Sequence, residues 1–468
     1  MKFPSEPFKI KVVEPIRRTT REQRDRLLRE AGYNLFQVPA ESVYVDLLTD
    51  SGTSAMSDRQ WAGLMLGDES YAGSRNYYRL EETVRSIFGY EHVIPTHQGR
   101  MAENLLFSTI VQPGMCVPNN IHFDTTRANV EHQRAEALDL VIKEAYDPHC
   151  ELPFKGNMDL NRLDETIHRV GRENIPLVMI TITNNSGGGQ PVSMENIRQT
   201  RALLNRYGIP LFFDACRFAE NCFFIKERES GYANTPVLTI ARELFSHGDG
   251  CTMSAKKDGL VNIGGFLSLN DEQWAQDITN MLILVEGFPT YGGLAGRDLE
   301  AMAIGLEEVL NEEYLRFRIS QVRYLGELLD QSGVPILKPT GGHAIYLNAK
   351  EFLPHIPQSE FPGQALAVAL YRDYGIRGVE IGTLMFGKKD PVTGRTIHPE
   401  LETVRLAIPR RVYTNMQITY VAESIIELYQ QRDRIHGLTL TYEAPMLRHF
   451  TARFAELQES PSREPMTV

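Results

Sequence analysis

The sequence predicts an α/β fold with one large domain and one smaller α+β domain. From about Tyr44 to Leu310, strand-like apolar runs alternate with amphipathic segments, as in a mostly parallel sheet covered by helices. Leu177–Thr183 and Ile209–Phe213 have the pattern of buried strands, and the pattern of Met194–Tyr207 between them predicts a helix. Together they form one βαβ unit. A length of 468 residues allows two or three domains.

The elements before and after this unit follow from local signals. The first 20 residues or so are interrupted by prolines and mixed in charge, which predicts an extended arm. Arg21–Gly32 is a charged helical stretch that ends in Ala-Gly. Asp298–Leu310 has apolar residues at helical spacing, and a long helical connection continues through Arg316–Gln331.

The last third of the chain predicts the smaller domain. Gly341–Leu347 and Val404–Ile408 have the pattern of strands, and a helix is expected near Gln364–Tyr374. We therefore expect an N-terminal arm over residues 1–18 and a large domain over residues 48–310. The small domain is expected to combine residues 19–47 with residues 311–468.

Composition and charge limit the class of protein. The chain is 42% hydrophobic and 23% charged, with a formal net charge of -11, which is ordinary for a globular protein. No window is apolar enough to span a bilayer, and the N-terminus lacks the apolar core of a signal peptide, so we expect a cytoplasmic protein without a membrane partner. The acidic balance gives no reason to expect nucleic acid. Five cysteines without a C-x-x-C pair make disulfides and a zinc site unexpected.

Two polar residues and a lysine pair stand where ligands bind in open α/β sheets. Asp214 directly follows the predicted strand ending at Phe213, and Asn185 ends the preceding strand. Lys256 and Lys257 have small or apolar neighbours, and an enclosed lysine is the residue type used for Schiff bases. A carboxylate about 40 residues before such a lysine suggests pyridoxal phosphate (PLP), whose ring nitrogen the carboxylate would keep protonated. Taken alone, Asp214 is equally well explained as a helix cap or as an ion-pair partner of Arg217, and paired lysines usually lie on a solvated surface.

A site for the cofactor phosphate is expected earlier in the chain. Thr96–Arg100 follows the apolar stretch Val93–Pro95 and opens a predicted helix over Ala102–Val111. A helix N-terminus with a glycine and an arginine binds anions through its backbone N–H groups and its dipole. The signal is unspecific by itself because no Walker or Rossmann fingerprint is present.

Long motifs distributed along the chain connect these observations. They are Asp46–Thr53, Gly67–Ser74, Pro95–Arg100, Ser254–Asp258, Phe288–Gly293 and Leu447–Ala452. With these motifs the chain resembles the tryptophanase and tyrosine phenol-lyase group of PLP-dependent β-eliminating lyases over essentially its whole length. The resemblance implies the aspartate aminotransferase-like fold of type I PLP enzymes, with a mostly parallel seven-stranded sheet. It also implies a potassium or other monovalent cation and a homotetramer with active sites shared across a dimer interface.

The resemblance assigns residues to the cofactor. Lys257 matches the Schiff-base lysine that also takes the Cα proton, and Asp214 matches the partner of the pyridinium nitrogen. Arg217 and Asn185 match contacts to the ring oxygen, and Phe123 matches the aromatic side chain that stacks on the ring. The residues that match the phosphate site are Gln98, Gly99, Arg100 and Ser254.

The resemblance also assigns the substrate and cation sites. Arg405 matches the arginine that clamps the substrate carboxylate, and Asn185 is expected to contact the substrate as well. Tyr71 matches the general acid that protonates the leaving ring, supplied by a neighbouring subunit. The segment that assists Arg405 contains Thr49, Ser51 and Gly52. The residues that match the monovalent cation site are Glu69, Gly52 and Asn262.

Three positions bear on the choice of substrate. Phenol-lyases read the ring hydroxyl with a threonine and an arginine, whereas this chain has Asp124 and Ile381 at the matching positions. His449 stands where phenol-lyases carry an aromatic residue. Because the indole N–H is a donor that needs an acceptor, we expect Asp124 to serve tryptophan, giving indole, pyruvate and ammonia. Tyrosine cleavage, a PLP aminotransferase and a non-catalytic binding protein are the alternatives.

Overall fold

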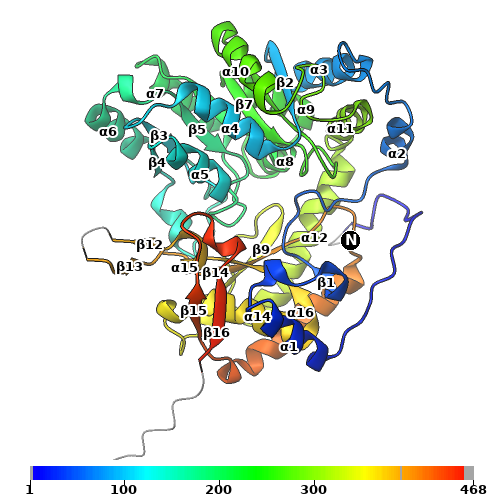
Figure 1. Cartoon of the computed structure of the whole chain (residues 1–468), viewed down its shortest axis with the longest axis vertical. Helices are drawn as coiled ribbons and strands as arrows, with labels where there is room; N and C mark the ends of the chain where they lie inside the picture. The colour runs from blue at the N-terminus through cyan, green and yellow to red at the C-terminus, as the bar shows by residue number, and fades with distance from the viewer. Residues whose placement is uncertain (1–3, 391–392, 458–468) are drawn as a thin grey trace, which may run out of the picture.

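A computed structural model describes residues 4–390 and 393–457. The chain forms two lobes, and the upper lobe in Figure 1 contains a seven-stranded sheet of order β2-β8-β7-β6-β5-β3-β4. Its strands are β2 (His92–Thr96), β3 (Cys116–Asn119), β4 (Glu136–Asp139), β5 (Val178–Thr181), β6 (Leu211–Asp214), β7 (Gly250–Ser254) and β8 (Gly265–Leu269). Only β8 runs against its neighbours, so the sheet is mostly parallel, as predicted.

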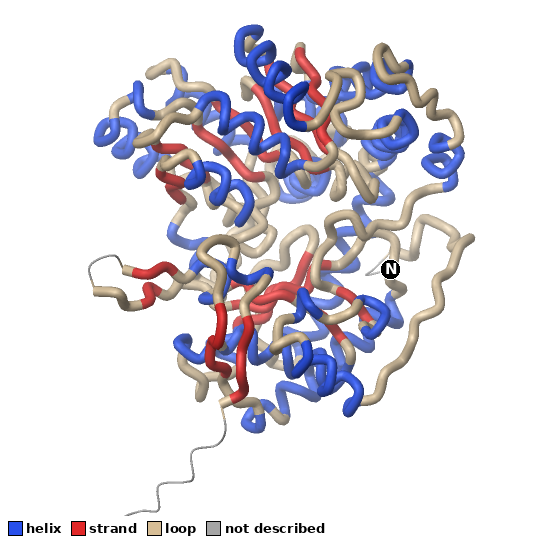
Figure 2. The backbone as a smooth tube through the Cα atoms, in the orientation of Figure 1, coloured by secondary structure: helices blue, strands red, loops and turns tan. Residues whose placement is uncertain are grey.

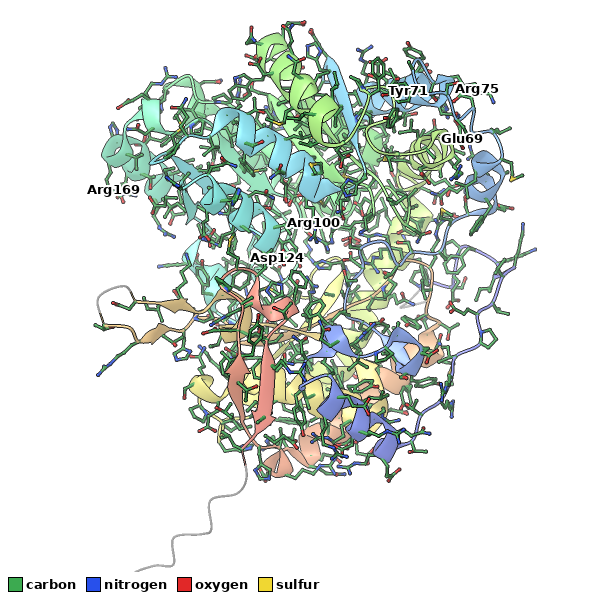
Figure 3. All side chains as sticks on the ribbon, in the orientation of Figure 1. Glu69, Tyr71, Arg75, Arg100, Asp124 and Arg169 are labelled. Atoms are coloured by element: carbon green, nitrogen blue, oxygen red, sulfur yellow. The ribbon has the colours of Figure 1, made fainter. Side chains whose placement is uncertain are left out.

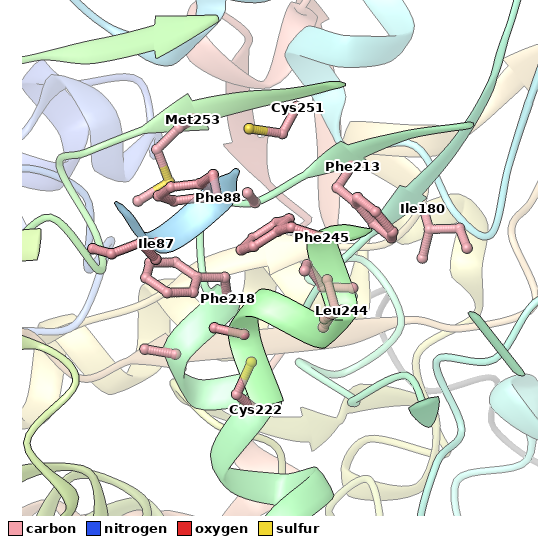
Figure 4. Packing of buried hydrophobic residues seen from close by; sticks show 14 of the residues in the cluster. Ile87, Phe88, Ile180, Phe213, Phe218, Cys222, Leu244, Phe245, Cys251 and Met253 are labelled. Carbon is pink, nitrogen blue, oxygen red and sulfur yellow. The ribbon is translucent and has the colours of Figure 1, made fainter. Parts of the chain in front are cut away.

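Helices cover both faces of this sheet. Since side chains alternate along a strand, Phe212 packs into one core and Phe213 into the other, which explains the continuous apolar runs of the central strands. Figure 4 shows Phe88, Phe218 and Phe245 gathered beside Phe213. The helices are α2 (Asp58–Leu64), α3 (Arg75–Phe88), α4 (Gly99–Ile110), α5 (Asp124–His132), α6 (Leu160–Val170), α7 (Met194–Asn205), α8 (Phe218–Arg228), α9 (Val237–Ser246), α10 (Glu272–Val285) and α11 (Gly296–Glu308).

The lower lobe, whose strands are red in Figure 2, has its own core around an antiparallel sheet of order β11-β14-β9. Its strands are β9 (Ala344–Asn348), β11 (Val379–Ile381) and β14 (Thr403–Ala407). Two-stranded pairs join β1 (Val45–Asp46) to β10 (Ile376–Arg377), β12 (Lys388–Lys389) to β13 (Thr396–Ile397), and β15 (Leu438–Tyr442) to β16 (Arg453–Glu456). The helices are α1 (Arg21–Glu30), α12 (Glu312–Gln331), α13 (Ala349–Phe352), α14 (Pro362–Tyr374), α15 (Thr383–Phe386) and α16 (Asn415–Gln430).

The predicted long helical connection is two helices. α11 ends at Glu308, and α12 begins at Glu312 because the Asn311 side chain accepts a hydrogen bond from the backbone N–H of Tyr314. α12 belongs to both cores: Leu315 packs in the upper core, and Leu325 packs in the lower one. The helix therefore connects the two lobes by packing in both cores.

The remaining elements lie close to their predicted positions. α4 begins at Gly99, three residues earlier than expected, so the predicted phosphate motif runs from the end of β2 into the first turn of the helix. Residues 4–20 contain no helix or strand, and the arm over residues 1–18 stays a prediction. Among the described residues, no helix is both long and apolar enough to cross a membrane.

Candidate active site

A cavity of about 240 Å³ lies between the lobes at the carboxyl edge of the seven-stranded sheet. The upper lobe contributes the segments that follow β2, β3, β5, β6 and β7, and the lower lobe contributes β11, β14 and the short helix η7 (Arg448–Phe450). A larger surface cavity, about 680 Å³, lies between Phe8, Arg59 and Glu308 and contains none of the predicted site residues. The site therefore has the location expected for a ligand of an open α/β sheet.

Most of the predicted site residues line the smaller cavity. They are Thr49, Ser51, Gln98, Gly99, Arg100, Phe123, Asp124, Asn185, Asp214, Arg217, Ser254, Lys257, Arg405 and His449. Five predicted residues do not line it, namely Gly52, Glu69, Tyr71, Asn262 and Ile381. Ile381 is buried in a small apolar cluster with Val379, and Val379 lines the cavity.

The end of β6 places a carboxylate and an arginine at the cavity. Asp214 is buried, and one of its oxygens accepts a hydrogen bond from the backbone N–H of Cys216 at 3.2 Å. The suggested ion pair between Asp214 and Arg217 is wrong. Arg217 instead binds Asp50 with two hydrogen bonds, from Nε at 3.0 Å and from Nη2 at 2.7 Å. Among residues 4–390 and 393–457, no arginine therefore pairs with Asp214.

The lysine pair lies on the turn that follows β7. Both side chains line the cavity, and Lys256 is half-buried. Burial and the charges of Lys257 and Arg100 lower the pKa of Lys256. The solvated-surface interpretation of the pair is therefore wrong for this turn.

The first turn of α4 is open toward the cavity. Its N-cap residue, Gln98, makes no side-chain capping bond, and Gln98, Gly99 and Arg100 line the cavity, so the helix N-terminus with its unpaired N–H groups lies at the site. Gly99 lies so close to β7 that an added Cβ would be 2.5 Å from the Cβ of Ser254. A glycine is required there because the helix terminus and the strand approach each other directly.

Glu103 lies one turn further along α4 and was not predicted as a site residue. Its Oε1 accepts a hydrogen bond from the Thr126 hydroxyl at 2.5 Å, while its Oε2 is buried without a partner in the described part of the chain. Burial and the charge of Asp214 raise the pKa of Glu103 to about 7. Glu103 is therefore a carboxyl group near Asp214 that is partly protonated at neutral pH.

Asn185 and Arg405 join the lobes across the cavity. The Asn185 Oδ1 accepts hydrogen bonds from Arg405 Nη1 at 3.0 Å and from the Tyr346 hydroxyl at 2.9 Å. Arg405 Nη2 also donates to the carbonyl of Leu48 at 3.1 Å, and its guanidinium carbon lies 6.0 Å from the centre of the Phe123 ring. The guanidinium is thus held at the cavity by neutral oxygens, which an anionic ligand can replace.

Asp124 and His449 form a buried pair at the cavity. The exposed fractions are 7% and 2%, and His449 Nε2 lies 3.1 Å from Asp124 Oδ2. The imidazole packs against Phe450, with ring centres 4.0 Å apart, and against Phe36 at 5.9 Å. The pair therefore presents a polar atom in an otherwise aromatic wall.

Glu69 and Tyr71 lie away from the cavity of their own chain. Figure 3 shows both on the far side of the upper lobe from Arg100 and Asp124. Tyr71 is 72% exposed and packs on Phe288 and Tyr291, with ring centres 5.8 Å and 5.3 Å apart.

The residues predicted to bind a cation are split between two places. Glu69 pairs with Arg297 at 2.9 Å, whereas Asn262 donates to the carbonyl of Gly52 at 2.9 Å. In the described ranges, no cluster of three or more His, Cys, Asp or Glu side chains is suited to a metal. A monovalent cation bound by backbone and amide oxygens would not produce such a cluster.

Ten further residues that were not predicted as site residues also line the cavity. They are Phe36, Leu48, Glu103, Thr125, Cys216, Thr252, Lys256, Val379, Met385 and Phe450. Some of them had a usable signal. A Glu four residues after Gly99 falls on the same face of the helix, Lys256 adjoins Lys257, and Leu48 and Phe450 lie within the long motifs. Phe36 and Met385 come from distant segments with no motif that marks them.

This donor set fits an aromatic ring that carries a phosphate, an aldehyde and a ring nitrogen. An amine, a carboxylate, an aromatic face and an anion-binding helix terminus meet in one enclosed space, contributed by Lys257, Asp214, Phe123 and α4. The close approach at Gly99 supports the fit to a phosphate, because any side chain there would displace β7 from the helix terminus that would bind it. The residues present are therefore compatible with PLP.

Comparisons with known proteins agree with this chemistry. The family model described as beta-eliminating lyase matches residues 46–424. A tryptophanase from Salinibacter ruber is 57% identical over 447 residues, covering 96% of this chain and 94% of its own. A tyrosine phenol-lyase from Symbiobacterium thermophilum is 54% identical over 450 residues, covering 96% of this chain and 98% of its own. A tryptophanase from Hyphomonas neptunium is 53% identical over 457 residues, covering 98% of this chain and 100% of its own.

Solved structures of more distant proteins show the same fold. The SepCysS–SepCysE N-terminal domain complex matches with a TM-score of 0.55 at 14% identity, covering 83% of this chain and 95% of that chain. A serine palmitoyltransferase from S. paucimobilis matches with a TM-score of 0.55 at 13% identity, covering 83% and 88%. These likenesses concern the fold alone, which is that of type I PLP enzymes.

Proposed function

Because this chain belongs to the β-eliminating lyase family of PLP-dependent carbon–carbon lyases, we propose that it cleaves L-tryptophan to indole, pyruvate and ammonia. Identity to relatives does not choose the substrate, since a tryptophanase at 57% and a tyrosine phenol-lyase at 54% are almost equally similar. The observation that carries the proposal is the buried pair of Asp124 and His449 in the cavity wall.

The cofactor is proposed to lie on the residues at the carboxyl edge of the sheet. Asp214 holds the proton of the ring nitrogen, Phe123 covers one face of the ring, and Arg217 and Asn185 contact the ring oxygen. When bound, PLP withdraws electrons from the substrate Cα and so makes the bonds around it breakable. Lys257 removes the Cα proton. The phosphate is bound by Gln98, Gly99, Arg100 and Ser254.

The substrate carboxylate is proposed to bind Arg405. In the absence of an anion, this guanidinium donates to the Asn185 amide oxygen and the Leu48 carbonyl. A carboxylate offers two charged acceptors in a bidentate geometry and is the better partner for both nitrogens. Asn185 is then released toward the substrate and the ring oxygen, and the segment of Thr49, Ser51 and Gly52 closes over the carboxylate.

The leaving ring is proposed to lie against Asp124. His449 donates from Nε2 to Asp124 Oδ2, which orients the carboxylate and leaves acceptor capacity for the indole N–H. Phenol-lyases bind the ring hydroxyl with a threonine and an arginine, whereas Ile381, buried beside Val379, offers no hydrogen-bonding group. The aromatic neighbours Phe36 and Phe450 suit the flat indole ring.

Protonation of the departing ring carbon is proposed for Tyr71 of a neighbouring subunit. Its exposed position away from its own cavity suits a residue that acts in another copy of the chain. The corresponding assembly is a homotetramer of cytoplasmic subunits, each with an arm over residues 1–18, a large domain over 48–310 and a small domain over 19–47 and 311–468. A potassium ion at Glu69, Gly52 and Asn262 completes the proposal.

The decisive experiment is product analysis with tryptophan and tyrosine side by side. The purified protein, supplied with PLP and potassium, is expected to release indole from tryptophan faster than phenol from tyrosine, without a keto acid. Dominant phenol release would overturn the substrate assignment, and dependence on a keto acid would indicate an aminotransferase. Lys257→Ala is the control for background elimination.

The double change Ile381→Arg with Asp124→Thr tests the same positions from the opposite direction. It installs the side chains that phenol-lyases carry, so tryptophan cleavage is expected to fall and tyrosine cleavage to appear. An unchanged tryptophan rate would show that these positions do not read the ring.

A further inference from the structure

Six charged side chains are buried together beneath the cavity, and the proposed chemistry uses only one of them. All are at most 3% exposed. We call them the buried ion cluster, which comprises Asp50, Arg217, Glu220, Asp258, Arg318 and Arg410. Three acids balance three arginines. Since a buried ion pair adds little net stability compared with apolar packing, the cluster calls for another explanation.

Asp50 is the carboxylate that holds Arg217, the cluster member that lines the cavity. It accepts both hydrogen bonds of Arg217, at 3.0 Å and 2.7 Å, and a third from Arg410 Nη1 at 2.9 Å. In the described part of the chain, Arg217 Nε and Nη2 are the guanidinium nitrogens with a hydrogen-bond partner, Nη1 has none, and Arg217 lines the cavity. Although burial opposes ionisation, the charge of Arg217 keeps the pKa of Asp50 well below its ordinary value.

The cluster also joins the segments that carry the site. Asp50 stands between Thr49 and Ser51, which line the cavity, while its own side chain points into the cluster. Asp258 follows Lys257 and accepts from Arg410 Nη2 at 2.8 Å. Arg410 itself follows β14, the strand of Arg405. A single network thus connects the carboxylate-binding segment, the lysine turn and the lower lobe.

We propose that Asp50 is a positioning residue that aims the Arg217 guanidinium at the ring oxygen of the cofactor. With Nε and Nη2 bound to one carboxylate, the planar guanidinium has a single orientation, and Nη1 is the only nitrogen left for the cavity. Arg410 binds Asp50 from the other lobe. The orientation of the Arg217 guanidinium therefore depends on the relative position of the two lobes. The inference rests on the proposed contact between Arg217 and the ring oxygen.

Asp50→Asn tests the inference because the amide keeps the shape but removes the charge and one acceptor. We expect its affinity for PLP, measured by fluorescence titration of the cofactor-free protein, to fall by about tenfold. The midpoint pH at which the bound cofactor changes its visible absorbance should rise by roughly 0.5–1 unit, since a poorly aimed cation stabilises the ring oxygen less.

Glu220→Gln is the matched control. Glu220 is equally buried and binds Arg318 and Arg410, but it does not contact Asp50 or Arg217. Both variants should melt at lower temperature, whereas only Asp50→Asn should shift the absorbance midpoint. Equal shifts in both variants would mean that the cluster acts through general stability, and the inference would be wrong.

Arg217→Gln separates this inference from the proposed function. If Asp50 acts through Arg217, the double variant with Asp50→Asn binds PLP no worse than Arg217→Gln alone. Additive losses overturn the positioning role. If Arg217→Gln itself leaves PLP affinity and the absorbance midpoint unchanged, the proposed ring contact is wrong. If Asp50→Asn does not fold, Asp50→Glu replaces it. This variant keeps the charge but moves the carboxylate, so the absorbance midpoint should still shift, and an unchanged midpoint would contradict the inference.

Discussion

Glu103 is a buried carboxyl group whose proton is held near neutral pH. Its pKa is raised to about 7, above the ordinary 4.5, by burial and by the charge of Asp214. In the cofactor-free protein the folded state therefore keeps a proton that the unfolded state loses as the pH rises from 4.5 to 7, and stability falls over that range. Glu103→Gln removes this dependence and keeps an acceptor for the Thr126 hydroxyl.

The expected result is a stability gap that opens with pH. At pH 4.5 the variant and the parent should unfold at similar denaturant concentrations, and at pH 8 the variant should be more stable by roughly 2–3 kcal/mol. Urea unfolding of the cofactor-free proteins at both pH values measures this difference in unfolding free energy. Parallel curves would place the Glu103 pKa near its ordinary value.

Asp124 gives the second prediction at this scale. Asp124→Asn weakens the acceptor proposed for the indole N–H, so kcat/KM for tryptophan should fall by about 10- to 100-fold. The matched control is the benzothiophene analogue of tryptophan, which has the same shape but no ring N–H. Its kcat/KM should change much less, and an equal loss for both substrates would point to altered packing around His449 rather than a lost hydrogen bond.

At the scale of elements, the approach of α4 to β7 shapes the proposed phosphate site. Gly99→Ala would place a Cβ 2.5 Å from the Ser254 Cβ and 2.8 Å from its Cα, so the helix terminus must move. We expect PLP affinity to fall by more than about tenfold and the unfolding free energy to fall by roughly 1–3 kcal/mol. Ser108→Ala, in the last turn of α4, is the control, because that hydroxyl bonds only to carbonyls of its own helix. Unchanged PLP affinity in Gly99→Ala would contradict the role of this helix terminus.

The same elements explain how much the sequence could predict. β5, α7 and β6 were found within a few residues because both strands are continuous apolar runs and Ser193 caps the helix. The break between α11 and α12 was missed because apolar spacing continues across it, although Asn311 followed by acidic residues is an N-terminal signal. The buried ion cluster could not be predicted from the sequence, since Asp50 and Arg410 are separated by 360 positions and neither belongs to a periodic pattern.

At the scale of the whole molecule, the surface around Tyr71 is notable for its exposed apolar side chains. Large apolar side chains are exposed around the segment of Tyr71, among them Trp61, Met65 and Tyr78. Exposed apolar groups of this kind are typical of interaction surfaces, and the homotetramer proposed above would cover this one. The motifs and the resemblance named the cavity residues and Tyr71 alike, but a sequence does not show which of them meet within one chain. The residue proposed to complete the cavity lies elsewhere because it would serve another copy.

Sharing of sites can be tested by mixing two inactive variants. Tyr71→Phe removes the proposed acid, and Lys257→Ala removes the proposed base. If Tyr71 acts in the neighbouring site, a mixed dimer has one site with both defects and one native site. Random pairing of co-expressed chains then restores about a quarter of the parent activity in tryptophan cleavage. If Tyr71 acted in its own chain, every site would carry one defect and the mixture would stay inactive. Each variant expressed alone is the control, and light scattering checks that the mixture assembles like the parent.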